Sequence, residues 1–80
     1  MNNVKVVQYG CGKMSVYTMR YVIENGGSIV GAVDINPSII GKDISTVIGG
    51  KEIGVNITSV DDAEEMLKRE KPDVCIITTM

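Results

Sequence analysis

The sequence has no histidine and only two cysteines among its 80 residues. Cys11 and Cys75 are far apart, and neither belongs to a Cys-x-x-Cys pair. Because zinc sites in proteins are built from clustered cysteine and histidine ligands, we expect no metal site and no metal-binding residues. We also expect no disulfide. Cys75 stands in an apolar run, which predicts a small buried side chain.

The chain also lacks an excess of positive charge and any long apolar run. Eight basic and ten acidic residues give a net charge of -2, and the basic residues are scattered. This composition predicts no nucleic-acid partner and no membrane partner, because no run approaches the roughly 18 residues of a membrane span. The polar opening, residues 1–5, lacks the basic start and long apolar stretch of a signal peptide, so we expect a cytoplasmic location.

Short apolar segments rich in β-branched residues alternate with helical patterns along the chain. The predicted elements are a strand over 4–9, a helix over 13–25, a strand over 29–33, a short helix around 43–48, a strand over 55–58, a helix from about 61 to 71, and a strand over 74–79. This alternation predicts an α/β fold with a parallel sheet and right-handed crossovers. At this length we expect one compact unit.

The last predicted helix has clear signals at both ends. We expect Asp61 to cap its start together with Glu64, and Pro72 to end it. One face carries the apolar residues Val60, Ala63, Met66 and Leu67. Pairs of opposite charge four residues apart should form on the outer face, namely Glu64 with Lys68 and Glu65 with Arg69.

The first helix is apolar on more than its sheet-facing side. Its charged residues Lys13, Arg20 and Glu24 fall in one narrow arc at helical spacing. The rest of the circumference is largely apolar, comprising Met14, Val16, Tyr17, Met19, Tyr21, Val22 and Ile23. Two interpretations stay open: these are scattered surface hydrophobes, or further sequence or a partner subunit packs on them.

A glycine turn separates the first strand from the first helix. Gly10 suits the tight turn, and Gly12 lets the backbone approach a diphosphate closely. The following helix would point its free N–H groups at the phosphates, and Lys13 could add a charge. Ser15 stands where the usual fingerprint has a third glycine, which is a departure from the pattern. The turn therefore predicts a Rossmann-type dinucleotide site.

Asp34 supports this interpretation from the end of the second predicted strand. It follows Gly12 by 22 residues, where an acidic residue binds the adenosine ribose hydroxyls. A carboxylate there repels a 2′-phosphate, and the next positive charge is only at Lys42. We therefore expect NAD as the cofactor, with NADP less favoured.

Two other classes of protein use similar elements. A methyltransferase dependent on S-adenosylmethionine also has a Gly-Cys-Gly turn, but its motif places an acid and a further glycine where this chain has Gln8 and Met14. A non-catalytic sensor would bind NAD through the same half-fold. Both remain alternatives to an NAD(P)-dependent oxidoreductase.

The sequence resembles the dihydrodipicolinate reductase superfamily over essentially its whole length. The stretch from Gly12 to Ser15 is similar to that superfamily's Gly-Arg-Met-Gly. The segment 41–57, which begins Gly-Lys-Asp-Ile and ends Gly-Val-Asn-Ile, is similar to a stretch that generic dinucleotide folds do not share. Within the superfamily, the strands at 4–10 and 29–34 most resemble the 2,4-diaminopentanoate dehydrogenase group.

The resemblance implies an NAD(P)-dependent dehydrogenase that deaminates an amino acid oxidatively, with dihydrodipicolinate reduction as the alternative. It implies that Gly10, Cys11, Gly12, Lys13 and Met14 line the diphosphate, that Asp34 holds the adenosine ribose, and that Thr78 and Thr79 lie near the nicotinamide ribose. Substrate-binding and catalytic residues belong to a later domain in this superfamily. We therefore expect residues 1–80 to be an N-terminal part of a Rossmann-type domain and to be inactive alone. The full-length protein is expected to be a homo-oligomer that binds its small-molecule substrate through the missing domain.

Overall fold

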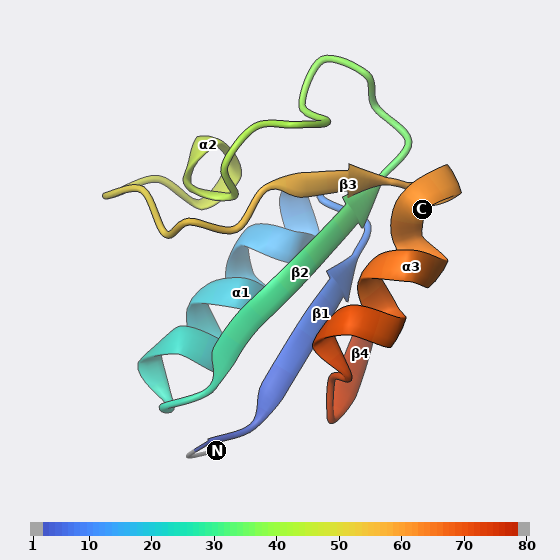
Figure 1. Ribbon diagram of the computed structural model, residues 1–80. Helices are drawn as coiled ribbons and strands as arrows, with labels where there is room; N and C mark the ends of the chain where they lie inside the picture. Colours follow the sequence, from blue (N-terminus) through green and yellow to red (C-terminus); the bar gives the residue numbers. More distant parts are fainter. Residues whose placement is uncertain (1–2, 79–80) are drawn as a thin grey trace.

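The computed structural model describes residues 3–78 as a parallel sheet flanked by helices (Figure 1). Its elements are β1 (Lys5–Tyr9), α1 (Lys13–Glu24), β2 (Ser28–Asp34), α2 (Ser45–Ile48), β3 (Ile57–Ser59), α3 (Val60–Glu70) and β4 (Val74–Ile77). The strands lie in the order β3-β2-β1-β4, and all three neighbouring pairs are parallel. The predicted α/β fold of Rossmann type is confirmed.

The central strand β1 sends alternate side chains to opposite faces of the sheet, as strand geometry requires. Val6 packs in the cluster beneath α1, and Val7 packs in the cluster beneath α3. The two helices therefore cover opposite faces (Figure 1). The α1 side is the larger core and includes Met19, Val22, Ile29, Ala32, Ile44, Ile48 and Ile57.

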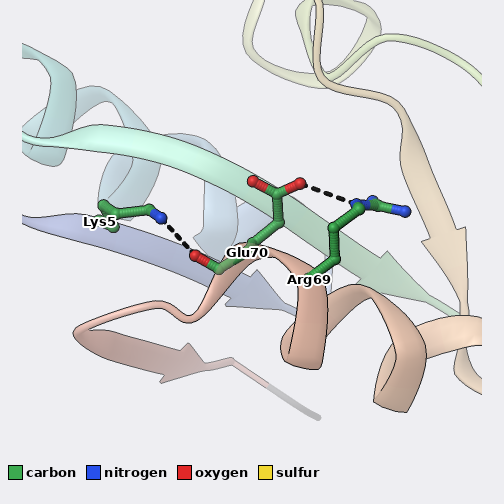
Figure 2. A network of polar contacts seen from close by, with 3 residues as sticks. All are labelled: Lys5, Arg69 and Glu70. Carbon is green, nitrogen blue, oxygen red and sulfur yellow. Dashed lines mark hydrogen bonds and ion pairs between the residues drawn. The ribbon is translucent and has the colours of Figure 1, made fainter.

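Lys5 joins the start of β1 to the connection between α3 and β4. Its backbone N–H donates to the Asp73 carboxylate at 2.8 Å, and its ammonium group donates to the Glu70 carbonyl (Figure 2). A positive charge is favourable there because carbonyl groups are left unpaired at the C-terminus of a helix. This contact ties α3 to β1.

The start of α3 differs from the prediction. The helix begins at Val60 with Ser59 as the N-cap residue, so Asp61 lies in the first turn and does not cap it. The Ser59 hydroxyl donates instead to Asp62 at 3.1 Å. Because Val60 is the first helical residue, its side chain lies beyond the packed face and is 42% exposed. Ala63 and Met66 are buried as predicted.

One of the two expected charge pairs on α3 forms. Lys68 lies 3.3 Å from Glu64, as predicted. Arg69 instead contacts Glu70 at 2.9 Å, so the expected pairing with Glu65 is wrong (Figure 2). Exposed pairs such as these contribute little, about 0–1 kcal/mol, and either geometry is compatible with the fold.

The predicted burial of Cys75 is also wrong, because β4 is an edge strand. Cys75 is exposed, and so are Val74 and Ile77. The helix α3 packs over β2 and β3 and leaves the corresponding face of β4 open. The strand ends at Ile77 within the described residues, so Thr78 follows the strand.

The helix α1 also has apolar side chains on its surface, and the exposed ones are Met14, Tyr17, Tyr21 and Ile23.

Asp43 organises the long connection between β2 and β3. Its carboxylate accepts hydrogen bonds from the backbone N–H groups of Ser45, Ile53, Gly54 and Val55, at 2.7–3.1 Å. Asp43 also forms an isolated antiparallel bridge with Asn56. These contacts close the loop just before β3 and support the short edge strand.

Among the helices of the described residues, none has the length and apolar character that a membrane span needs.

We expect Asp43→Asn to lower the midpoint of urea unfolding, while Glu65→Gln on exposed α3 leaves it unchanged. The N–H donors, from Ile53 first, hold the pKa of the Asp43 carboxyl well below its ordinary value of 3.8. The stabilisation is therefore complete above pH 3.8 and is lost as the pH falls through the lower folded-state pKa. Equal midpoints for the two variants at pH 7 would contradict this role.

Candidate functional site

The carboxyl ends of β1, β2 and β4 meet at a hollow of about 320 Å³. The chain order reverses here, because β2 lies on one side of β1 and β4 on the other. In open parallel sheets such a reversal is the usual place for a ligand crevice. The residues that line the hollow are Tyr9, Gly10, Cys11, Gly12, Val33, Asp34, Ile35, Val60 and Thr78.

Gly10 makes the turn that leaves β1. Its φ angle is +98°, a region that side chains with a Cβ rarely adopt. A Cβ on Gly10 would also stand 2.7 Å from the Thr78 carbonyl oxygen, well inside van der Waals contact. The Gly10 N–H donates to the Val33 carbonyl at 2.8 Å. Glycine is therefore needed here by the protein itself.

Within the described residues, no contact requires glycine at position 12. It is the N-cap residue of α1 with an extended backbone, and a Cβ added to it would meet no atom within 4 Å. No side chain caps the helix within the described residues. The first N–H groups of a helix have no partner inside it, so α1 offers free donors and the positive end of its dipole. The open space above Gly12 is where an anionic group can approach.

Asp34 fixes the turn and still faces the hollow. Its Oδ2 accepts the Cys11 N–H at 2.6 Å, and its Oδ1 accepts the N–H groups of Ile35 and Asn36 at 2.6 and 2.9 Å. Partial burial raises the pKa of this carboxyl, but the three backbone donors together lower the pKa by more, so the net shift is downward. Asp34 is therefore ionised at neutral pH. A carboxylate has about four acceptor positions, so one remains for a ligand hydroxyl.

Cys11 takes part through its backbone. Its side chain is buried in the core, with the sulfur 3.6 Å from the Val33 carbonyl. Burial is the larger cause and the nearby Asp34 carboxylate the smaller cause of a raised pKa of the Cys11 thiol, about 11. The thiol is therefore neutral and unreactive at neutral pH. Because the Cys11 N–H is already bonded to Asp34, phosphate groups would meet the N–H groups that follow it.

Among the other residues predicted for the site, Lys13 and Met14 occupy the exposed first turn of α1 and do not line the hollow. Thr78 does line it, and Thr79 lies outside the described residues. Ser15, at the position of the third glycine, is completely buried, and its hydroxyl donates to the Gly12 carbonyl at 2.6 Å. The serine is accommodated because its polar group has a partner.

Several residues of this region were not predicted from the sequence as site residues. Besides Tyr9 and Val33, the apolar side chains of Ile35 and Val60 line the hollow, with 80% and 42% of their surfaces exposed. Gln8 lies beneath the glycine turn and is completely buried. Its signal in the sequence is a polar side chain among the apolar residues of β1. No group of three or more potential metal ligands occurs among residues 3–78.

The two glycines should respond differently to the same added methyl group. We expect Gly10→Ala to lower the free energy of unfolding by about 1–3 kcal/mol, because it combines an unfavourable φ with a backbone clash. Gly12→Ala should cost less than about 1 kcal/mol, the usual scale of an N-cap change. Chemical denaturation followed by circular dichroism measures both. Similar losses for the two variants would contradict the assignment.

Comparisons with known proteins show the same fold. No protein-family model and no curated protein sequence matches the chain. Among solved structures, an amine dehydrogenase from Mycobacterium smegmatis superposes with a TM-score of 0.84 and 32% sequence identity over 92% of this chain. The aligned region is 22% of that enzyme, so the chain spans about a fifth of its length.

Structures of RSP, a Rex-family repressor, are more distant in sequence. One in complex with β-NADH superposes with a TM-score of 0.76 and 22% identity over 99% of this chain and 35% of that one. Another, described as a Rex-family repressor, has a TM-score of 0.76 and 22% identity over 98% of this chain and 34% of that one. These similarities show that the chain has a Rossmann-type fold.

Proposed function

We propose that this chain is the dinucleotide-binding part of an NAD-dependent oxidoreductase. The observation that carries the proposal is the hollow at the carboxyl end of the sheet, where the uncapped end of α1, the open face of Gly12 and the ionised Asp34 converge. These are the features that recognise a diphosphate and a ribose. The similarity to an amine dehydrogenase and to NADH-bound RSP supports it.

The residues around the hollow suggest how the dinucleotide would lie. The diphosphate would accept hydrogen bonds from the first turn of α1, above Gly12. The adenosine ribose would donate to the remaining acceptor position of Asp34. Ile35 and Val60, apolar and exposed beside it, would cover the adenine ring. Thr78, across the turn, would lie toward the nicotinamide ribose.

The charge of Asp34 favours NAD over NADP. The lowered pKa of its carboxyl keeps it negative at neutral pH, so it would repel the 2′-phosphate of NADP. No basic residue lines the hollow within the described residues. A positive group is what an NADP site usually supplies at this point.

The proposed reaction is hydride transfer between the nicotinamide and a carbon bearing an amine. The bound cofactor would supply the hydride chemistry, and this chain would bind and orient it. We propose oxidative deamination of an amino acid such as 2,4-diaminopentanoate, with reduction of a dihydrodipicolinate-type imine as the alternative. Because the chain spans a fifth of the amine dehydrogenase it resembles, the groups that bind the substrate and move its protons would lie elsewhere in a longer protein. A homo-oligomeric full-length protein also stays a prediction.

A second candidate is a non-catalytic sensor of NADH. RSP structures are described in complex with β-NADH, and with β-NAD+ and operator DNA. A sensor must prefer one redox form of the cofactor strongly, whereas a dehydrogenase binds both. The ratio of the two dissociation constants therefore distinguishes the candidates.

Direct titration tests the proposal. We expect NADH fluorescence to report saturable binding to the wild-type chain, and Gly12→Val to abolish it while the helical circular dichroism signal persists. The valine would fill the space that the diphosphate needs, whereas in the free protein a Cβ at this position meets no atom within 4 Å. Thermal protection by S-adenosylmethionine, with none by NADH, would instead indicate a methyltransferase.

Asp34→Ala should weaken NAD binding by roughly tenfold or more, the scale of a lost hydrogen bond to a charged group, and weaken NADP binding less. The variant loses the ribose contact for both cofactors, but it also removes the repulsion of the 2′-phosphate. Asp34→Asn is the matched control, because it keeps the size of the side chain and one acceptor oxygen for the backbone N–H groups of the turn, while it removes the charge and replaces the other oxygen with an NH₂ donor. Isothermal titration with both cofactors measures the effect, and equal losses would count against the ribose assignment.

A further inference from the structure

Gln8 makes several polar contacts beneath the glycine turn. The residue is completely buried in β1, on the face of the sheet covered by α1. Burying an amide costs free energy unless its donors and acceptor are paired. Within the described residues no buried side-chain polar atom lacks a partner, and the Gln8 amide is among those that are satisfied. A leucine or valine would suit this position if packing were its only role.

The amide joins three separate parts of the proposed site. Its Nε2 donates to the Gly10 carbonyl at 2.9 Å and to the Thr78 hydroxyl at 2.8 Å. Its Oε1 shares the single proton of the Thr18 hydroxyl, on α1, with the Ser15 carbonyl, at 2.8 and 3.0 Å. One side chain therefore connects the glycine turn, the residue after β4 and the helix whose end faces the hollow.

The hydroxyl of Thr78 is committed to the same network. It accepts from Gln8 and donates to the Gly10 carbonyl at 3.0 Å. A hydroxyl has a single proton to donate, so Thr78 has none left for a ribose. Thr78 therefore supports the turn and is not a hydrogen-bond donor to the ligand. The Gly10 carbonyl therefore accepts hydrogen bonds from both Gln8 and Thr78.

We propose that Gln8 is a positioning residue that holds the glycine turn in its ligand-binding shape before the dinucleotide arrives. The proposal rests on the function proposed above. A turn that is already ordered loses less conformational freedom on binding, and this raises affinity without any direct contact to the ligand. Gln8 does not line the hollow, so it would act only through the groups that it binds, and its bonds to the Gly10 carbonyl and the Thr78 hydroxyl place the effect at the glycine turn and not at Asp34.

The test compares two ligands that use different parts of the site. We expect Gln8→Met, which keeps the length of the side chain and removes its hydrogen bonds, to weaken NADH binding roughly tenfold. Binding of adenosine, which has no phosphate and would reach only Asp34 and its apolar neighbours, should change less than twofold. A merely structural role would weaken both ligands together. Fluorescence titration measures NADH, and amide chemical shifts measure adenosine.

The free protein provides an independent signature. Heteronuclear NOE values for the backbone amides at 10–12 should fall in Gln8→Met, while those at the second glycine turn, residues 26–27, should not. Thr78→Val removes part of the same network from a less buried position and should reproduce the NADH-selective loss even where Gln8→Met does not fold. The double variant should bind NADH no worse than Gln8→Met alone, because both changes act through one network.

The outcomes separate this proposal from the one on which it rests. If the wild-type chain fails to bind NADH, both proposals are overturned. If wild-type binds and the two variants bind NADH equally well, or if NADH and adenosine weaken in parallel, only the role of Gln8 is overturned. Loss of order at 10–12 together with selective loss of NADH supports it.

Discussion

The structure depends on how the glycine turn is held between the ends of two strands. The Asp34 carboxylate, at the end of β2, binds the Cys11 N–H, and the Gly10 N–H binds the Val33 carbonyl of the same strand. From the other side, Thr78 and the buried Gln8 bind the Gly10 carbonyl. These contacts fix the direction in which α1 begins. Because the turn is hydrogen-bonded on both sides, it keeps its position between the strand ends, beside the hollow.

Some polar groups of the site are hydrogen-bonded within the protein, and the others are left for a ligand. The Cys11 amide and the Thr78 hydroxyl are used within the protein, and the thiol of Cys11 is buried and neutral. What remains available is the uncapped end of α1 and an acceptor position on Asp34. A phosphate acceptor and a ribose donor complement these groups. The two glycines show the same division, since Gly10 is needed by the fold and Gly12 leaves open space.

Away from the hollow, apolar surface remains uncovered on one helix and on the edge strand. On α1 the exposed side chains include Tyr17 and Tyr21, and on β4 they include Val74 and Ile77. Both regions are exposed because the described residues supply no element to cover them. That further sequence or a partner subunit packs on these regions stays a prediction.

The sequence alone determined the fold. Strand and helix periods, the glycine turn and the spacing to Asp34 are local or regularly repeated signals, and they correctly predicted the parallel sheet; of the residues singled out for the site, Gly10, Cys11, Gly12, Asp34 and Thr78 line the hollow. Only the tertiary structure decided what depends on neighbours distant in the chain. Cys75 is exposed because its strand lies at an edge, Asp34 is bonded to the turn, and Gln8 is paired with Thr78, which lies 70 residues away. Burial and hydrogen bonding between such residues follow from strand order, which no local pattern encodes.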